Sequence, residues 1–219
     1  MRKSREGGRV GAQVSTPTAR AERPLRSDAR RNRERLIAAG RAVLTTRGSE
    51  ASMDEIAKAA DVGVGTLYRH FPRRIDLVEA VYREEVDALV ALAGQVAERL
   101  GAWEAMVAWF EGFVDYAHAK RTFLTELHEA FEKNPELALS SREKIRGAMG
   151  QVLGRAQEAG VARSDIDGAD LQQLVGGMCM ARTASLEQNR RLLLLVLDGI
   201  RTAGPGSLMA TAAQRRERR

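Results

Sequence analysis

Few side chains in this 219-residue chain are arranged for acid–base, nucleophilic or metal chemistry. The three histidines, His70, His118 and His128, lack the close spacing to one another or to the single cysteine, Cys179, that a zinc site needs. Cys179 falls in an apolar helical stretch, which predicts a buried and inert thiol. No Gly-x-Ser-x-Gly motif is present. We therefore expect no metal, no cofactor and no enzymatic activity.

Hydrogen bonding to phosphate or to base edges is the chemistry that one short segment can supply. Thr66, Tyr68 and His70 all carry side-chain donors and follow one another closely. Ser52 stands where a helix is predicted to begin, and free backbone amides and the helix dipole favour a phosphate there. Tyr68 also suits a half-buried packing position. These side chains fit a polyanionic partner.

Two short helices must position these side chains. Ser52 and Glu55 form a capping box, in which the Ser52 hydroxyl accepts the Glu55 amide and the Glu55 side chain reaches back. The helix ends at residues 61–63, and the next helix runs through residues 64–71 until Pro72 stops it. Two short helices joined by a tight turn predict a helix-turn-helix unit, whose second helix enters the DNA major groove.

Other helices flank this unit. One is predicted to begin near Ser27 or Asp28 and to end at Gly48, and another runs from about Arg73 to Leu100.

Apolar side chains keep helical spacing beyond residue 100, with a break at residues 134–135, a helix cap at Asp167 and a last helix over residues 192–200. The pattern predicts an all-α fold of about nine helices.

The segment from Ser52 to Leu77 closely resembles the DNA-binding domain of the tetracycline-repressor (TetR) family. The residues that carry the resemblance most strongly are Ile56-Ala57, Val62, the run Gly65-Thr66-Leu67-Tyr68, Phe71 and Asp76-Leu77. The match is specific over about residues 28–78, and beyond residue 80 only the general helical layout is similar. Ile56, Leu67 and Phe71 are expected in the core.

The resemblance implies two domains. A three-helix helix-turn-helix DNA-binding domain would span residues 27–78, and a helical ligand-binding and dimerisation domain would span residues 79–204. Composition and the lack of periodicity predict that residues 1–26 and 205–219 are disordered basic tails. The first tail, with Ser27, holds seven Lys or Arg against two Glu, and the last holds four Arg against one Glu. Basic tails suit a polyanion, but they equally suit solvated tails that bind nothing specific.

The resemblance also implies which residues contact DNA. Thr66, Tyr68 and His70 would donate from the recognition helix. Arg74 occupies a position where the family usually has a lysine that meets the DNA backbone. The full set implied is Arg47, Ser52, Val64, Gly65, Thr66, Tyr68, His70 and Arg74.

Two positions depart from the family pattern. The usual glycine of the turn is Asp61 here, which tolerates left-handed geometry better than most residues. The usual serine before the recognition helix is Gly63, which loses a capping hydroxyl at a cost of only a few tenths of a kcal/mol. Val64 and Gly65 offer no side-chain hydrogen bonds, so methyl contacts to thymine and DNA shape would contribute to specificity.

A homodimer is expected, because one recognition helix reads too few base pairs. A small-molecule effector is expected as well, since the resemblance implies a ligand-binding domain. The residues predicted at the dimer interface are Leu171, Leu174, Val175, Met178, Leu193, Val196, Leu197 and Ile200, although burial within one monomer explains the same pattern. Residues 192–197 are apolar around the whole helix, which predicts burial on more than one side.

Seven of the ten aromatic residues fall between Trp103 and Phe131, and this cluster suggests a pocket, although plain core packing explains it as well. The residues predicted to line the pocket are Trp103, Met106, Phe110, Phe113, Phe123, His128, Met149 and Met178. Four acidic residues would suit a cationic ligand, or form a solvated face: Glu111, Asp115, Glu126 and Glu129.

The predicted function is therefore a homodimeric repressor of the TetR type that binds double-stranded DNA and leaves it when a largely apolar effector binds. The chain shows no secretory signal and no stretch of about 20 apolar residues, so a cytoplasmic, nucleoid-associated protein without a membrane partner is expected. Two alternatives stay open. One is a non-specific architectural DNA-binding protein that uses its tails. The other is a helical enzyme, for which His118 and His128 near Glu126 and Glu129 are the only candidates.

Overall fold

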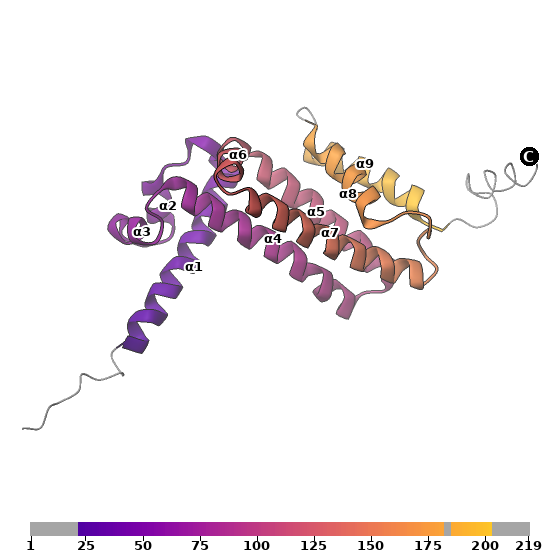
Figure 1. Cartoon of the computed structure of the whole chain (residues 1–219), viewed down its shortest axis with the longest axis horizontal. Coiled ribbons are helices and arrows are strands. Elements are labelled where there is room, and N and C mark those ends of the chain that lie inside the picture. Colours follow the sequence, from indigo (N-terminus) through magenta and orange to yellow (C-terminus); the bar gives the residue numbers. More distant parts are fainter. Residues whose placement is uncertain (1–21, 182–184, 203–219) are drawn as a thin grey trace, which may run out of the picture.

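The computed structural model describes residues 22–181 and 185–202, and these residues form nine α-helices and one short 3-10 helix (Figure 1). The all-α prediction is confirmed. The helices are α1 (Glu22–Arg47), α2 (Met53–Ala59), α3 (Val64–His70), α4 (Arg74–Arg99), α5 (Ala102–Arg121), α6 (Leu124–Lys133), α7 (Pro135–Glu158), α8 (Gly168–Met180) and α9 (Leu186–Ile200). No helix in these two ranges is long and apolar enough to cross a bilayer.

Helix α1 begins earlier than the sequence pattern predicted. It starts at Glu22 rather than near Ser27, so residues 22–26 are helical and not part of a disordered tail. Pro24 is compatible with this start, because the first turn of a helix makes no use of its amide N–H groups. The remainder of both predicted tails, residues 1–21 and 205–219, lies outside the described residues. The predicted end at Gly48 is confirmed, and its φ of 55° is left-handed.

The helix-turn-helix prediction is confirmed by α2 and α3. Ser52 and Glu55 make the predicted capping box at the start of α2. Asp61 adopts a φ of 51° in the turn, as its tolerance of left-handed geometry allows. Gly63 caps α3 without a side-chain hydrogen bond. Local sequence signals therefore account for the helix caps and the turn of this unit.

Helix α4 extends from the α2–α3 unit along the length of the molecule and packs against α1, α5, α6 and α7 (Figure 1). It runs without interruption across the predicted domain boundary at residue 78. The core contains its side chains Leu77, Val81 and Leu89, and the indole N–H of Trp109 on α5 donates to the Leu89 carbonyl at 2.9 Å. One continuous core therefore joins the two regions.

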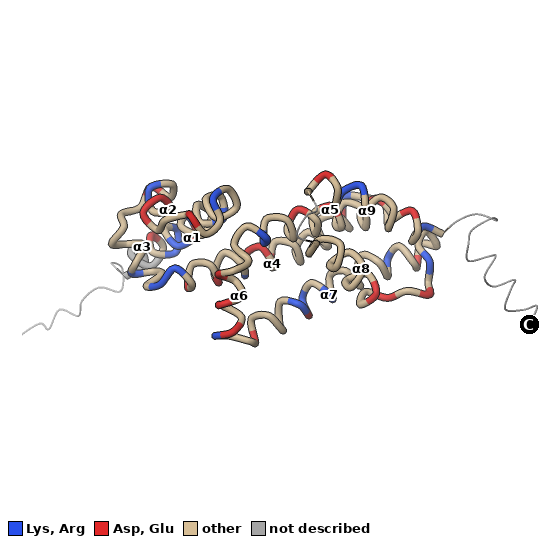
Figure 2. Tube along the Cα trace, turned by 90° about the horizontal axis from the view of Figure 1, so that it is seen from above, with Lys and Arg blue, Asp and Glu red and all other residues tan. Residues whose placement is uncertain are grey.

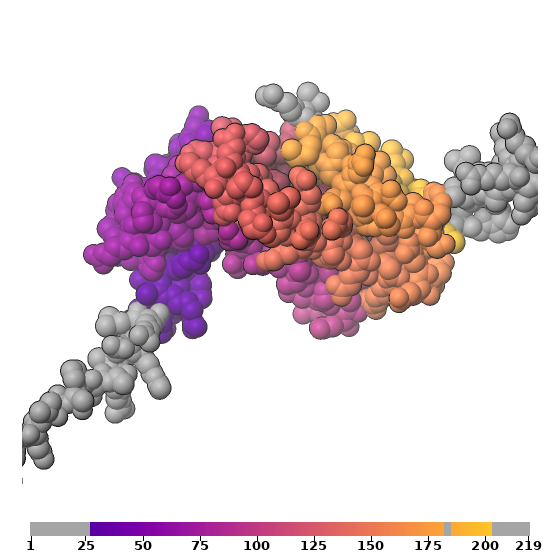
Figure 3. Space-filling view, viewed as in Figure 1, coloured from indigo at the N-terminus to yellow at the C-terminus, as the bar shows by residue number. Residues whose placement is uncertain are grey.

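Helices α8 and α9 lie at the opposite end of the molecule from α2 and α3 (Figure 3). Asp167 caps α8 as predicted, with its side chain accepting from the Ala169 and Asp170 amides. Helix α9 begins at Leu186, earlier than predicted, because Ser185 caps it through the Gln188 amide.

Candidate nucleic-acid interface

The two short helices form a rigid unit because their inner sides are buried. Ile56 of α2 and Leu67 of α3 are completely buried, and Phe71 is buried directly after α3. The core predictions for these three residues are confirmed. The guanidinium of Arg33, on α1, lies 5.5 Å from the centre of the Phe71 ring. Helix α1 therefore covers the rear of α3 and fixes the direction in which its outer edge faces.

A second link holds the turn between α2 and α3. Arg35 of α1 donates from Nη2 to the Asp61 carbonyl at 2.7 Å and to Asp61 Oδ2 at 2.9 Å. The carbonyl contact stabilises the left-handed turn, whereas the ion pair is exposed and contributes little. Sequence reasoning missed Arg35, since no local pattern connects residues that are 26 positions apart.

The outer edge of α3 is open. Val64 and Tyr68 are 40% and 45% exposed, Gly65 is exposed, and Thr66 and His70 are partly exposed. Tyr68 is thus a surface residue and not a packing residue. The structure brings all five predicted α3 residues to the surface, with donors beside an apolar valine and a glycine that leaves open space. Such an edge can approach base edges and phosphates together.

Ser52 and Arg47 are both engaged with Glu55. The Ser52 hydroxyl accepts the Glu55 amide at 3.1 Å, and the Ser52 amide donates to Glu55 Oε2 at 3.0 Å. Arg47 Nη1 donates to Glu55 Oε1 at 2.6 Å. The backbone hydrogen bond from Ser52, followed by the charge of Arg47, holds the pKa of Glu55 below its ordinary value. Any phosphate contact from these two residues would compete with this carboxylate.

Arg74 contacts other parts of the chain. Its guanidinium donates to the Gly48 carbonyl at 3.1 Å and to the Ala51 carbonyl, and it pairs with Glu126 Oε1 of α6 at 3.0 Å. The side chain is 28% exposed. Within the chain, Arg74 therefore joins the start of α2 to α6. Its contact with the DNA backbone stays a prediction.

Two exposed cations near this edge were missed by sequence reasoning. Lys58 lies in the last turn of α2 and Arg69 in the last turn of α3, and both are exposed. Figure 2 shows Lys and Arg distributed over α1, α2 and α3. The positive charge of these two side chains, close in sequence to the recognition helix, could have identified them as candidates for phosphate contact. Either side chain can place a positive charge beside the open edge of α3.

The predicted ligand pocket is largely corrected. Met106, Phe110 and Met149 are completely buried core residues, and Phe123 is buried as well. Aromatic residues that follow one another along a helix take different faces, so this cluster mostly fills the core.

Trp103 and His128, two further residues predicted to line the pocket, differ in their surroundings. Trp103 is partly buried under the guanidinium of Arg201, whose centre lies 5.0 Å from the ring. The His128 side chain is 76% exposed and lies near Glu132, so it faces solvent and not a cavity. Glu126, an acidic residue considered beside His118 and His128, pairs with Arg74 at 3.0 Å.

Of the predicted set, Phe113 lines a cavity of about 560 Å³ between α4, α5, α6, α7 and α8. Its other lining residues are Tyr82, Tyr116, Ala117, Lys120, Phe131, Ala138, Arg142, Ile145, Ala169, Gln172, Gln173, Gly176 and Met180. Sequence reasoning missed Lys120, because a lysine at the end of a helix is usually a solvated residue. The cavity is of the size that small-molecule sites have.

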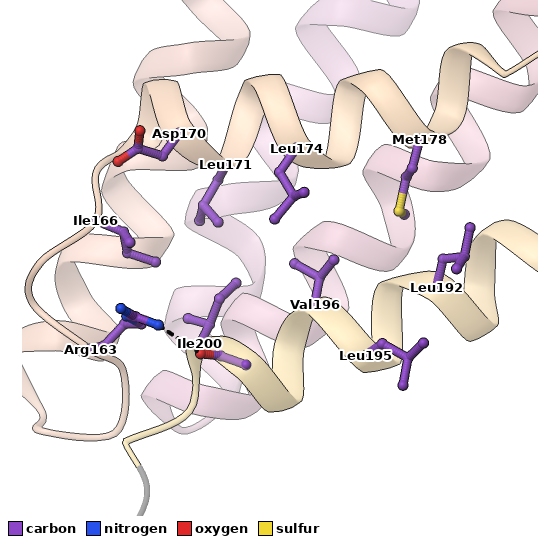
Figure 4. A pocket seen from close by; sticks show the side chains of 11 residues that line it. Arg163, Ile166, Asp170, Leu171, Leu174, Met178, Leu192, Leu195, Val196 and Ile200 are labelled. Atoms are coloured by element: carbon purple, nitrogen blue, oxygen red, sulfur yellow. Dashed lines mark hydrogen bonds between the residues drawn. The ribbon is translucent and has the colours of Figure 1, made fainter. Parts of the chain in front are cut away.

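The predicted dimer interface is also corrected in part. Five of the eight residues are buried within the chain itself: Leu171, Val175, Leu193, Leu197 and Ile200. An apolar groove of about 500 Å³ between α8 and α9 is lined by two of these, Leu171 and Ile200, together with the remaining three, Leu174, Met178 and Val196 (Figure 4). Leu194 and Leu195, which were not predicted, are 56% and 68% exposed.

The single cysteine fits its prediction. Cys179 is buried on α8, and burial raises the pKa of its thiol to about 11. A protonated and inaccessible thiol is unreactive at neutral pH.

A buried two-helix unit with one exposed edge on its second helix defines a helix-turn-helix DNA-binding protein. The comparisons with known proteins agree. Residues 36–81 match the family described as "Bacterial regulatory proteins, tetR family", and residues 101–202 match "Transcriptional regulator SbtR-like, C-terminal domain".

Individual relatives extend the match over most of the chain. The crystal structure of the TetR transcriptional regulator SCO0520 from Streptomyces coelicolor is 36% identical, covers 78% of this chain and 99% of that one, and has a TM-score of 0.71. A TetR transcription regulatory protein from Mycobacterium vanbaalenii is 31% identical, with coverage of 82% and 100% and a TM-score of 0.65. The HTH-type transcriptional regulator UidR of Escherichia coli is 25% identical over 194 residues, which are 82% of this chain and 97% of UidR.

The chain therefore belongs to the TetR family of transcriptional regulators. It is a DNA-binding regulator and not an enzyme.

Proposed function

We propose that the protein is a homodimeric repressor that binds a specific operator through α3 and releases it when a small, largely apolar ligand occupies its C-terminal helical domain. The observation that carries this proposal is the two-sided character of α3. Leu67 is completely buried, whereas Val64 and Tyr68 of the same helix are among the exposed large side chains. A helix fixed on one side and open on the other suits a major groove.

Each exposed residue has a role in this proposal. Thr66, Tyr68 and His70 donate to phosphates or base edges. Gly65 has no atom within 4 Å of the position that a Cβ would take, so its backbone can approach a base closely. Val64 supplies a methyl contact for thymine.

A homodimer follows from the α8–α9 end. Leu174, Leu194 and Leu195 are each more than half exposed, and an apolar patch of this kind marks an interaction surface. Two copies joined here would carry two recognition helices, which must lie about 34–36 Å apart to enter successive major grooves.

Release by a ligand is supported by the links between the cavity and the DNA-binding helices. Phe131 of α6 lines the cavity, and Glu126 of the same helix pairs with Arg74 beside the start of α2. A ligand that prefers a displaced α6 would shift the spacing of the recognition helices. A coupling free energy of about 1–3 kcal/mol gives a 5–150-fold change in operator affinity.

Selection of duplexes from a random pool by the full-length protein tests the proposal. We expect an enriched site with two-fold symmetry. Thr66→Ala and Tyr68→Phe should each weaken binding to that site about fivefold, because each removes one hydrogen bond of about 1 kcal/mol. Fluorescence anisotropy measures the affinities, and Lys144→Met, at an exposed lysine of α7, is the matched control.

Removal of residues 1–21 and 203–219 separates this function from non-specific DNA binding. A repressor keeps its operator preference and loses only salt-sensitive affinity. A pool with no enriched sequence, or a preference that vanishes with the tails, would instead identify an architectural DNA-binding protein.

A further inference from the structure

The cavity between α4, α5, α6, α7 and α8 combines aromatic rings with positive charge. The Lys120 ammonium lies 5.4 Å from the centre of the Tyr82 ring, 6.0 Å from that of Tyr116 and 5.7 Å from that of Phe131. Arg142 of α7 also lines the cavity, whereas its lining contains no Asp or Glu. The charged groups that a ligand meets there are therefore both cationic.

Lys120 lacks a counter-ion in the part of the chain that is described. Its ammonium pairs with no carboxylate there and lies over ring faces instead. Burial, together with the charge of Arg142, lowers the pKa of Lys120 to about 8. A desolvated ammonium without an anion is unfavourable, and a bound anion would supply the missing charge.

A cationic ligand does not suit this cavity. The ring faces that would hold a cation are already covered by the Lys120 ammonium. Three of the four acidic residues that sequence reasoning considered for a cationic ligand pair with other cations: Asp115 with Arg190, Glu126 with Arg74, and Glu129 with Lys133.

We propose that this cavity binds a small organic anion, a carboxylate or another singly charged acid on a flat apolar body. The acidic group lies at Lys120 and Arg142, and the apolar body packs against Tyr82, Phe113 and Phe131. The inference rests on the proposed function, since this anion is the ligand that releases DNA.

The position of Lys120 connects the anion to the DNA-binding helices. Lys120 is two residues before Thr122, whose carbonyl oxygen would lie 2.4 Å from a Cβ at Gly48. The end of α5 therefore touches the junction between α1 and α2. A displacement of Lys120 by the anion would have only two residues to cross before it reached this junction.

A matched pair of fluorescent probes tests the charge preference in the full-length protein. Anilinonaphthalene sulfonate carries one anionic group, and N-phenylnaphthylamine has the same rings without it. We expect Lys120→Met to weaken binding of the sulfonate about tenfold or more and to change binding of the neutral probe less than about twofold. Lys144→Met, at an exposed lysine paired with Asp87, should change neither.

Arg142→Gln provides a second variant at an exposed position, so the test does not depend on the folding of one protein. It should also weaken the sulfonate selectively. Unchanged sulfonate affinity in both variants, or tighter binding of the neutral probe to the unaltered protein, would overturn the proposal. Duplex selection on the same proteins tests the proposed repressor function separately from the anion site. If the protein binds the anion through Lys120 but selects no DNA sequence, the repressor proposal is wrong and the anion-site proposal stands.

Discussion

Lys120 shows how a single side chain can be retained at a cost in stability. Its ammonium lies among Tyr82, Tyr116 and Phe131 and faces Arg142, and its pKa is lowered to about 8 from an ordinary 10.5. The folded state therefore disfavours the charged form, which dominates at neutral pH. A desolvated cation that has this cost and no counter-ion among the described residues is typical of a binding site.

Lys120→Met should accordingly raise the free energy of unfolding at neutral pH by about 1–2 kcal/mol, because it removes the desolvation penalty. The unfolded chain retains the Lys120 proton up to about pH 10.5, whereas the folded chain loses it near pH 8. Between these values the unfolded state binds more protons, so this group makes the unaltered protein more stable as pH rises. The advantage of the variant should therefore shrink across this window.

Urea unfolding of both proteins at several pH values measures this difference. Burial raises the pKa of Tyr116 well above its ordinary value, so that hydroxyl stays neutral in the window. Other titrating groups are common to both proteins and cancel. A variant that is less stable at neutral pH, or a difference that grows with pH, would contradict the explanation.

At the scale of elements, the contact between the end of α5 and the junction of α1 and α2 holds the two regions together. Gly48 has a φ of 55°, and a Cβ there would lie 2.4 Å from the Thr122 carbonyl oxygen. The Arg74 guanidinium accompanies this contact, since it donates to the Gly48 carbonyl and pairs with Glu126. The close approach requires a glycine for both its backbone angle and its lack of a side chain.

Gly48→Ala should lower the free energy of unfolding by about 3 kcal/mol, the sum of a left-handed backbone penalty and a clash with backbone atoms. Gly160→Ala is the matched control, because Gly160 has a φ of 71° but no atom within 4 Å of its Cβ position. It should cost only about 1 kcal/mol. Thermal and denaturant unfolding compare the two variants, and equal losses would show that the Thr122 contact is not tight.

At the scale of the whole molecule, the two functional ends are separated. Helices α2 and α3 lie at one end, the apolar groove between α8 and α9 lies at the other, and α4 joins the first end to the centre (Figures 1 and 3). The proposed dimerisation through α8 and α9 would leave both α3 edges accessible. The relative orientation of the subunits then sets the distance between the two recognition helices.

Leu195→Glu should convert the dimer to a monomer at micromolar concentration, since it places a charge on the most exposed leucine of α9. Leu139→Glu, at a 55% exposed leucine of α7, should leave the dimer intact. Sedimentation velocity distinguishes these outcomes. If the Leu195→Glu protein remains dimeric, the dimer interface does not include the exposed face of α9.

Features set by hydrogen bonds between close neighbours could be predicted from the sequence. The capping boxes at Ser52 and Asp167, the left-handed positions at Gly48 and Asp61 and the order of the helices all follow from residues within a few positions of one another. Part of the open edge of α3 was predictable for the same reason, because helical spacing places Val64 and Tyr68, four positions apart, on one face and turns Tyr68 by about 100° from Leu67.

Only the tertiary structure decided which side of each apolar helix is buried and which charges meet. Leu193 and Leu195 are of one type, yet one is buried and the other exposed. Arg35 and Asp61, or Arg74 and Glu126, are joined only by folding. The Lys120 cavity needs rings from three helices. Caps depend on local backbone geometry, whereas burial and pKa depend on the distant elements that exclude water, and these are brought together by packing alone.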